Sequence, residues 1–340
     1  MNNRAVIGLS GGVDSAVAAA LLAEEGYDVT AVFLHNGSSR ADAEEAAARS
    51  VSGALSIPLV RADIGGLLER EVCAPFAEEY LRGRTPSPCV LCNERVKFRA
   101  LFGEAERLGA DSVATGHYAA AERWPGGPVL LRDTGSAKDQ SYMLCRLSPA
   151  WVSRCRFPLE GRDKGEIRAM AAERGIPVAH RPDSMEICFV PDGDYAAFVE
   201  RRGEIPPEGD FTDTEGNVLG RHKGIHHYTV GQRKGLGIAL GRPAYVKAVD
   251  PEQNRVVLAF AGGEYAREVR LSGCLWHLPV DGPFDAEVRV RYSRAAFPAR
   301  VWPEGENARL VFADPVRAPA PGQAAAIYRD RFLTAAGWIG

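Results

Sequence analysis

The sequence lacks any apolar run long enough to cross a membrane. Its longest uncharged apolar run, Ala16–Ala23, is far shorter than the roughly 20 residues that a spanning helix needs. The first ten residues, MNNRAVIGLS, also lack the layout of a secretory signal peptide and lead directly into a strand pattern. We therefore expect a cytoplasmic protein that does not bind membranes.

An excess of basic charge is also missing. The 41 Lys and Arg residues are balanced by 44 Asp and Glu residues, which gives a formal net charge of −3. Any binding of nucleic acid must then rely on local basic patches. The cysteines lack a framework as well: there are seven, an odd number, without regular spacing. A disulfide-stapled secreted domain is therefore not expected, and reduced thiols are the default.

What the first 200 residues do have is an alternation of strand and helix patterns. Strand patterns occupy residues 5–9, 29–35, 57–63 and 112–117, and helix patterns occupy residues 13–25, 42–55, 67–81 and 93–108. Such alternation predicts βαβ units on a parallel sheet. Ligands of such a sheet bind beyond the C-terminal ends of its strands.

The pattern changes after Gly203. Residues 205–241 are rich in Gly, Pro and His, and short alternating strand patterns follow at 287–292, 299–302, 309–312 and 324–328. Residues 259–340 contain ten arginines and no lysine. We expect an α/β catalytic domain over residues 1–200, a small central domain over 201–258 and a C-terminal β-barrel over 259–340.

A glycine-rich loop, Gly8–Ser15 (GLSGGVDS), follows the first strand and opens the first helix. Adjacent glycines allow a sharp turn that directs backbone N–H groups at an anion, and the helix N-terminus adds partial positive charge. The loop has neither the Lys-Ser/Thr of a Walker loop nor the GxGxxG spacing of a dinucleotide fold. Because Asp14 would repel a phosphate, its position suggests a pyrophosphate bridged by Mg²⁺.

Two cysteines, Cys89 and Cys92, lie in a proline-rich segment that leads into a helix pattern. A position near a helix N-terminus predicts a lowered thiol pKa for Cys92. The local charge of this stretch is +4, since only Glu94 opposes five basic residues: Arg82, Arg84, Arg95, Lys97 and Arg99. The segment therefore predicts a reactive thiolate beside a polyanion-binding surface. A buried structural cysteine or half of a zinc site are alternatives, although no second C-x-x-C is present.

The loop S-G-G-x-D-S resembles that of the PP-loop ATP pyrophosphatases, which cleave ATP between the α and β phosphates. Further motifs follow in order: T-P-x-P-x-x-x-C-N-x-x-x-K-F, A-T-G-H-Y (114–118), K-D-Q-S-Y (138–142), D-S-x-x-I-C-F (183–189) and H-H-Y-T-x-G-Q-R-K-G-L-G (226–237). Together they resemble the bacterial tRNA-specific 2-thiouridylases (the MnmA/TrmU family) over essentially the whole chain.

The resemblance implies a reaction in two stages. ATP adenylates the C2 oxygen of the wobble uridine, because a uridine carbonyl is a poor electrophile until its oxygen becomes a leaving group. A cysteine persulfide then delivers sulfur and AMP leaves. By matching motifs, Cys92 is the nucleophile and Cys188 the persulfide carrier, and the two end as a disulfide. The implied partners are tRNA, gripped at its anticodon stem–loop, and a sulfur donor protein that carries a persulfide.

The resemblance also implies binding residues. Those for ATP are Gly8, Leu9, Ser10, Gly11, Gly12, Val13, Asp14, Ser15, Leu34 and Gly116. The target base is expected at Ser87, Pro88 and Cys89. The tRNA is expected at His117, Lys138, Asp139, Gln140, Arg291, Tyr292 and Gln323. The end of the second strand departs from the family, since it reads Leu-His-Asn-Gly (34–37) where Met-Lys-Asn-Trp is usual.

Cys89 opens an alternative sulfur chemistry, because many family members carry Asp at this position. Three thiols, Cys89, Cys92 and Cys188, could hold a [4Fe–4S] cluster with one iron open, as in related tRNA thiolases. Two rival functions lie in other classes: a PP-loop ligase acting on a small molecule, and a non-catalytic RNA-binding module. The paired cysteines count against the ligase, and the pyrophosphatase loop counts against the module.

Overall fold

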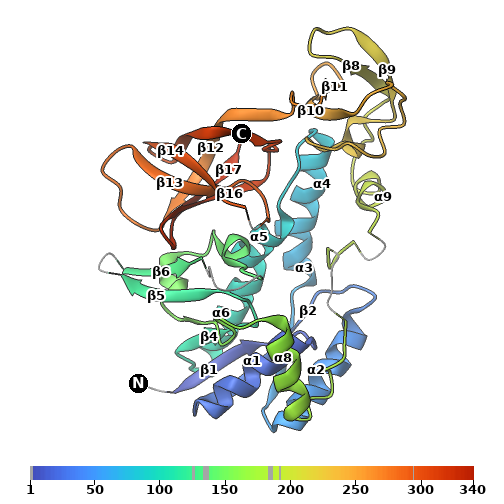
Figure 1. Ribbon diagram of the computed structural model, residues 1–340. Helices are drawn as coiled ribbons and strands as arrows, with labels where there is room; N and C mark the ends of the chain where they lie inside the picture. Colours follow the sequence, from blue (N-terminus) through green and yellow to red (C-terminus); the bar gives the residue numbers. More distant parts are fainter. Residues whose placement is uncertain (1–2, 125–126, 133–137, 183–186, 191–192, 294) are drawn as a thin grey trace. The chain divides into compact units, whose positions relative to one another are not determined.

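The computed structural model describes residues 3–124, 127–132, 138–182, 187–190, 193–293 and 295–340 (Figure 1). The chain divides into two compact units. The first comprises residues 1–72, 89–193 and 331–333, and the second comprises residues 73–88, 194–330 and 334–340. Among the described helices, none has the length and apolar character needed to span a membrane.

The first unit is built on a parallel sheet whose strands run in the order β3-β2-β1-β4-β7. The strands are β1 (Arg4–Gly8), β2 (Asp28–His35), β3 (Leu59–Asp63), β4 (Ser112–Ala114) and β7 (Cys155–Arg156). The chain builds one half of the sheet from β1 to β3 and then crosses back to place β4 beside β1. The predicted α/β sheet is therefore confirmed, and its topological switch point lies between β1 and β4.

Helices cover both faces of this sheet (Figure 1). Ala- and Leu-rich α1 (Val13–Glu24) is buried along nearly its whole length, and it packs with α2 (Ala41–Leu55) and α8 (Lys164–Glu173) in one apolar core. On the other face, α6 (Phe98–Leu108) contacts β1 and β4. The remaining helical segments of the unit are α3 (Gly65–Leu68), η1 (Glu69–Cys73, partly in the second unit), α5 (Pro88–Cys92), η2 (Asn93–Lys97), η3 (Ser141–Leu144) and α7 (Pro149–Val152).

Several expected boundaries shift. The helix pattern over 67–81 is interrupted by the π-helical turn η1, and the pattern over 93–108 begins with a second π-helical turn, η2. The strand expected at 112–117 ends at Ala114, so Thr115–His117 form the loop beyond it. The hairpin of β5 (Ala120–Trp124) and β6 (Gly127–Leu131) was not foreseen. Both strands are only five residues long, and their apolar and polar residues alternate incompletely, so the sequence pattern indicates this hairpin only weakly.

The second unit contains a barrel, as predicted (Figure 1). In the described chain, six antiparallel strands follow the order β12-β15-β14-β13-β16-β17, and pairing of β12 with β17 closes the ring. They are β12 (Tyr265–Trp276), β13 (Phe284–Arg289), β14 (Phe297–Glu304), β15 (Asn307–Arg317), β16 (Ala324–Arg329) and β17 (Phe332–Ile339). The interior alternates small and large residues, such as Ala325 beside Ile327. The strand expected at 287–292 instead ends at Arg289.

The rest of the second unit is a smaller sheet with two helices. Its strand order is β10-β11-β8-β9, from β8 (Gly209–Thr212), β9 (Val218–His222), β10 (Ala244–Asp250) and β11 (Arg255–Phe260). Helix α4 (Ala74–Leu81) packs against α9 (Tyr195–Glu200) and the 3₁₀ turn η4 (Ile225–His227). The rings of Tyr80 and Tyr195 lie 4.6 Å apart, tilted by 31°, and join the two helices. Residues 73–88 thus pack with a segment more than 100 residues further along the chain.

Candidate functional site

The loop after β1 is folded as an anion cradle. Gly11 has φ +74°, and a Cβ there would lie 2.6 Å from the carbonyl oxygen of Glu44 on α2, so only glycine fits. Gly12 is the extended N-cap of α1, whose first-turn N–H groups have no intrahelical acceptors. The Ser15 hydroxyl accepts from the Ser10 backbone N–H at 3.2 Å and donates to the Gly12 carbonyl at 3.0 Å. Leu9 and Val13 are buried and anchor the loop in the core.

Gly116, beyond β4, lies against this cradle. A Cβ at Gly116 would be 2.7 Å from the Ser15 backbone nitrogen and 2.8 Å from the Asp14 carbonyl carbon. The two segments that the sequence assigned to ATP therefore meet at the switch point between β1 and β4. This is where doubly wound sheets bind nucleotides.

Asp14 is held by partners that the sequence analysis did not identify. Lys164, the first residue of α8, places Nζ 2.7 Å from Asp14 Oδ1 and 2.8 Å from Oδ2. The Tyr118 hydroxyl donates to Oδ1 at 2.6 Å. Both oxygens that Mg²⁺ would use already accept hydrogen bonds. Binding of a cation at Asp14 would therefore require Lys164 to leave the carboxylate.

The three candidate thiols lie close enough to influence one another electrostatically. Among the described residues all seven cysteines are free; Cys89 and Cys188 are exposed and Cys92 is half-buried. A negative charge on Cys89 or on Cys188 would raise the pKa of Cys92, and one on Cys89 would raise that of Cys188. Such mutual effects require proximity, so the fold brings Cys188 to the C-x-x-C segment nearly 100 residues away.

The predicted lowering of the Cys92 pKa is wrong. Cys92 is not at a free helix N-terminus, because α5, η2 and α6 form one continuous helical run from Pro88 to Leu108. Burial raises the pKa of the Cys92 thiol to about 11, although the positive charge of Lys97 acts in the opposite direction. Desolvation by the surrounding protein also raises the pKa values of Cys89 and Cys188, and Lys97 opposes both shifts.

Lys97 is therefore the cation shared by the three thiols, and Lys97→Met should raise the pKa of Cys92 further. Below that pKa the rate of alkylation by iodoacetamide follows the thiolate fraction, so the Cys92 rate should fall several-fold. The measurement is the pH dependence of alkylation, with the Cys92 peptide quantified by mass spectrometry. Arg99→Met removes an exposed charge two residues away and should leave the profile unchanged. Superimposable Lys97→Met and parent profiles would refute this role of Lys97.

Asn36 links the cysteines to the edge of the sheet. It is the first residue after β2 and lies two positions beyond Leu34, which is expected to contact ATP. Its Oδ1 accepts the Ser38 backbone N–H at 3.0 Å, and its side chain hydrogen-bonds the Cys188 thiol, which lowers the pKa of that thiol. The sequence analysis missed Asn36, although its presence in the strand-end motif was a usable signal.

The thiols do not form a site for a single metal ion. Within the described chain, the groups whose potential ligand atoms all lie within 4.8 Å of one another are Glu200–His226–His227 and His35–Asp42–Glu45. The three sulfurs are not such a group. A multi-iron cluster holds its thiolate ligands further apart than a single metal ion does, so three free thiols on two segments are compatible with a cluster. They are equally compatible with a persulfide relay.

Four residues expected to contact tRNA lie in the first unit, and side-chain contacts are described for His117, Asp139 and Gln140. His117 is half-buried, its Nδ1 is 2.8 Å from Thr115 Oγ1, and its ring stacks on Phe98. Burial, and the charge of Lys97, hold its pKa well below the usual range. Gln140 Oε1 accepts the Tyr118 backbone N–H at 2.9 Å, while Asp139 accepts from Ser141. Lys138 is half-buried.

The remaining predicted contacts lie in the second unit or next to it. The Ser87 hydroxyl accepts the Ala324 backbone N–H at 3.2 Å, and Pro88 begins α5. Arg291 donates to the Arg317 carbonyl at 2.7 Å, and Tyr292 is 52% exposed. Gln323 bonds through its backbone to Ala320 and Ile339. Of these residues, Tyr292 is therefore the large aromatic side chain that solvent reaches most readily.

The basic stretch around the cysteines is partly neutralised. Arg84 pairs with Glu79 at 2.7 Å, Arg82 with Glu78 at 3.9 Å and Arg95 with Glu71 at 4.0 Å. Glu94 is the acidic residue that the sequence count set against these basic residues. Its partner is Arg146, outside the stretch, which donates two hydrogen bonds of 2.9 and 3.0 Å to it. The local excess of positive charge is therefore smaller than the sequence count suggests. Residues 183–186 of the motif before Cys188 lie outside the described residues.

Comparison with known families accounts for nearly the whole chain. Residues 3–192 match the family described as tRNA methyl transferase HUP domain. Residues 196–259 match the tRNA methyl transferase PRC-barrel domain, and residues 266–339 match the aminomethyltransferase beta-barrel domain.

Relatives align with this chain over nearly their whole length. The chain is 43% identical to the tRNA-specific 2-thiouridylase MnmA of Acidithiobacillus ferrooxidans, over 99% of this chain and 98% of the relative. It is 42% identical to the protein of that name from Heliobacterium modesticaldum, over 100% of this chain and 93% of the relative. Among solved structures, a 4-thiouridine synthetase–RNA complex with bound ATP aligns with TM-score 0.39 at 21% identity, over 58% of this chain and 50% of that one.

Proposed function

Because this chain belongs to the family of the tRNA-specific 2-thiouridylases, we propose that it uses ATP to replace the C2 oxygen of the wobble uridine of tRNA with sulfur. The observation that carries the proposal is the meeting of two kinds of chemistry in the first unit. An anion cradle follows β1. Three neighbouring thiols lie in the same unit, and one of them, Cys188, is hydrogen-bonded by Asn36 at the end of the adjacent β2.

In the first step the cradle binds the phosphates of ATP, and the uridine C2 oxygen attacks the α-phosphorus. Pyrophosphate leaves, and the oxygen becomes part of an adenylate. The N–H groups of α1 stabilise the negative charge of the phosphates. The Lys164 side chain can turn from Asp14 so that its ammonium group pairs with the departing pyrophosphate. Mg²⁺, if bound, would be held by Asp14 and the phosphates and would neutralise their charge.

In the second step Cys188 carries the terminal sulfur as a persulfide supplied by a donor protein. That sulfur adds to C2 of the adenylated base. The Cys92 thiolate then attacks the Cys188 sulfur: the bond to the transferred sulfur breaks, a Cys92–Cys188 disulfide forms, and the electron pair stays on the transferred sulfur. Collapse at C2 expels AMP. The transferred sulfur has been reduced by two electrons, so a thiol reductant must reopen the disulfide before the next turnover.

The residue roles that we propose rest on the resemblance to the family. ATP would contact the loop Gly8–Ser15 with Leu34 and Gly116, and the target base would lie at Ser87, Pro88 and Cys89. The tRNA would be held by His117, Lys138, Asp139 and Gln140 in the first unit, and by Arg291, Tyr292 and Gln323 in the second. A [4Fe–4S] cluster on Cys89, Cys92 and Cys188 is the alternative sulfur carrier. Full-length relatives named as tRNA enzymes disfavour a small-molecule ligase.

The test is a reconstituted reaction with purified protein, ATP, unmodified tRNA and a persulfide donor. We expect AMP, pyrophosphate and tRNA bearing 2-thiouridine at the wobble position, detected by nucleoside mass spectrometry. Release of orthophosphate in place of pyrophosphate, or a methylated base instead of a thiolated one, would contradict the proposal. Assay of iron and sulfide after anaerobic purification decides between a persulfide and a cluster.

Binding of tRNA should depend steeply on salt despite the acidic chain. If several phosphates are contacted, affinity should fall on the order of 100-fold between about 50 and about 200 mM salt. Arg291→Glu should weaken binding at low salt and reduce the slope, while the affinity for ATP stays unchanged. Fluorescence anisotropy with labelled tRNA measures both quantities. A flat salt dependence would show that the proposed arginine contacts do not carry the interaction.

A further inference from the structure

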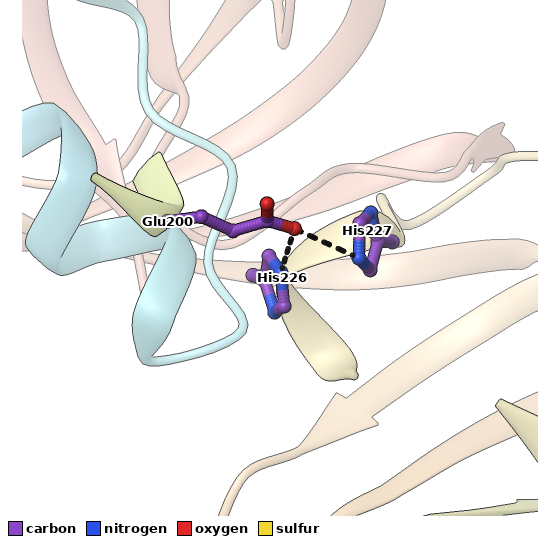
Figure 2. Close-up of side chains that lie close together, drawn as sticks. All are labelled: Glu200, His226 and His227. Carbon is purple, nitrogen blue, oxygen red and sulfur yellow. Dashed lines mark hydrogen bonds and ion pairs between the residues drawn. The ribbon is translucent and has the colours of Figure 1, made fainter. Parts of the chain in front are cut away.

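Two histidines in the second unit converge on one carboxylate (Figure 2). Glu200 ends α9, and His226 and His227 end the turn η4. Glu200 Oε1 is 3.2 Å from His226 Nε2 and 3.3 Å from His227 Nε2. All three potential ligand atoms lie within 4.8 Å of one another. The motif that contains these histidines has no part in the proposed thiolation chemistry.

The spacing of these atoms is that of a tetrahedral metal site. Zinc binds imidazole nitrogen and carboxylate oxygen at about 2.0–2.2 Å, so its tetrahedral ligands lie roughly 3.3–3.5 Å apart. The two observed N···O separations are close to this value. Two histidines and one carboxylate leave a fourth position for water, whereas Mg²⁺ and Ca²⁺ require oxygen ligands throughout. We propose that Glu200, His226 and His227 bind one zinc ion.

The surroundings allow a metal to enter and to be retained. The His226 side chain is fully buried and that of His227 is 14% exposed, so solvent reaches the imidazoles only to a small extent. The Glu200 side chain is 34% exposed and provides the path from solvent. Rings of His226 and His227 lie 4.1 Å apart and tilted, so the two imidazoles reach the same oxygen from adjacent directions. Bound zinc would therefore cross-link α9 to η4.

Ligation through Nε2 requires the proton to sit on Nδ1. In the described part of the chain, Nδ1 of His226 is buried without a hydrogen-bond partner. This nitrogen faces Gly224, since a Cβ built on that glycine would lie only 2.9 Å from it. Gly224, at φ +116°, also leaves the room that the His226 ring occupies.

The second His-carboxylate group, His35–Asp42–Glu45, is a poorer candidate. The Asp42 side chain is 96% exposed, and Glu45 already pairs with Arg49 and with Arg61. A cation there would have to displace two arginines and would be open to water. The group at Glu200 has no competing basic partner among the ion pairs of the described residues.

The experiment uses the full-length, untagged protein after removal of metals with a chelator. Cobalt(II) replaces zinc as a spectroscopic probe. We expect one equivalent to bind, with the intense visible bands of tetrahedral cobalt and without the near-ultraviolet sulfur-to-cobalt bands that thiolate ligands cause. Zinc should abolish the bands by competition. It should also raise Tm, because it binds the native state.

Glu200→Gln is the decisive variant, since the amide oxygen can still accept both histidine N–H groups but is a poor metal ligand. Its affinity for cobalt should be at least tenfold weaker, and zinc should no longer raise its Tm; His227→Gln should behave likewise. Glu204→Gln and His180→Gln alter exposed residues outside the cluster and should bind as the parent does. Absence of stoichiometric binding in the parent protein, or equal binding by parent and Glu200→Gln, would overturn the proposal.

Discussion

Cys92→Ser and Cys188→Ser should each reduce tRNA thiolation to below about 1% of the parent rate, because a hydroxyl can neither carry a persulfide nor attack one. Both variants should still form the adenylate, because that step uses the phosphate cradle and not the thiols. The expected result is release of pyrophosphate that depends on tRNA, without 2-thiouridine. Pyrophosphate is measured by a coupled assay and the nucleoside by mass spectrometry.

Cys274→Ser supplies the matched control. Cys274 is half-buried like Cys92, but it belongs to the barrel of the second unit, so its replacement should leave thiolation intact. Cys92→Ser should also trap the sulfur on Cys188, and mass spectrometry of the Cys188 peptide should detect the persulfide after incubation with the donor. Normal thiolation by either of the two cysteine variants would exclude the proposed relay.

Cys89→Asp distinguishes the two sulfur carriers. If a persulfide is used, Cys89 only lines the base pocket, and substantial activity should remain. If a cluster is used, the carboxylate is a poorer iron ligand than a thiolate, so iron content and activity should fall together. Thiolation by iron-free protein would eliminate the cluster, whereas iron-dependent thiolation with free sulfide would eliminate the persulfide on Cys188.

Gly116→Ala should abolish the use of ATP, with pyrophosphate release falling at least about 100-fold, equivalent to about 3 kcal/mol of lost transition-state stabilisation. The added methyl carbon would lie 2.7 Å from the Ser15 nitrogen and 2.9 Å from its Cα. These are backbone atoms of the phosphate cradle, so relief of the contact requires the cradle itself to move. Its N–H groups would then no longer point at the phosphates.

Gly103→Ala is the control for this substitution. Gly103 is an exposed interior residue of α6, and no atom lies within 4 Å of a Cβ built there. Alanine should therefore stabilise the helix by about 0.5–1 kcal/mol and leave catalysis unchanged. ATP binding by calorimetry and thermal unfolding separate loss of the site from loss of the fold. A Gly116→Ala variant that bound ATP normally would contradict the assignment of the cradle.

The strand and helix periods of the first 200 residues were sufficient to predict a parallel sheet, and the alternating strands after residue 259 were sufficient to predict a barrel. Both are local patterns, since side chains must alternate or repeat along one element to face a core. The loop Gly8–Ser15 was recognisable for the same reason: its glycines and serine act through contiguous backbone. The pairing of β12 with β17 that closes the barrel joins segments far apart in sequence.

Other features depended on distant contacts. The pKa of Cys92 rises because other segments bury it, which outweighs the effect expected from its local sequence. The sequence by itself determined the chemical inventory: a phosphate loop, paired cysteines and an Arg-rich barrel segment. Only the tertiary structure decided that Lys164 holds Asp14, that Asn36 meets Cys188 and that Glu200 meets His226 and His227. Each of these contacts joins residues 26 to about 150 positions apart, and no local period encodes such a distance.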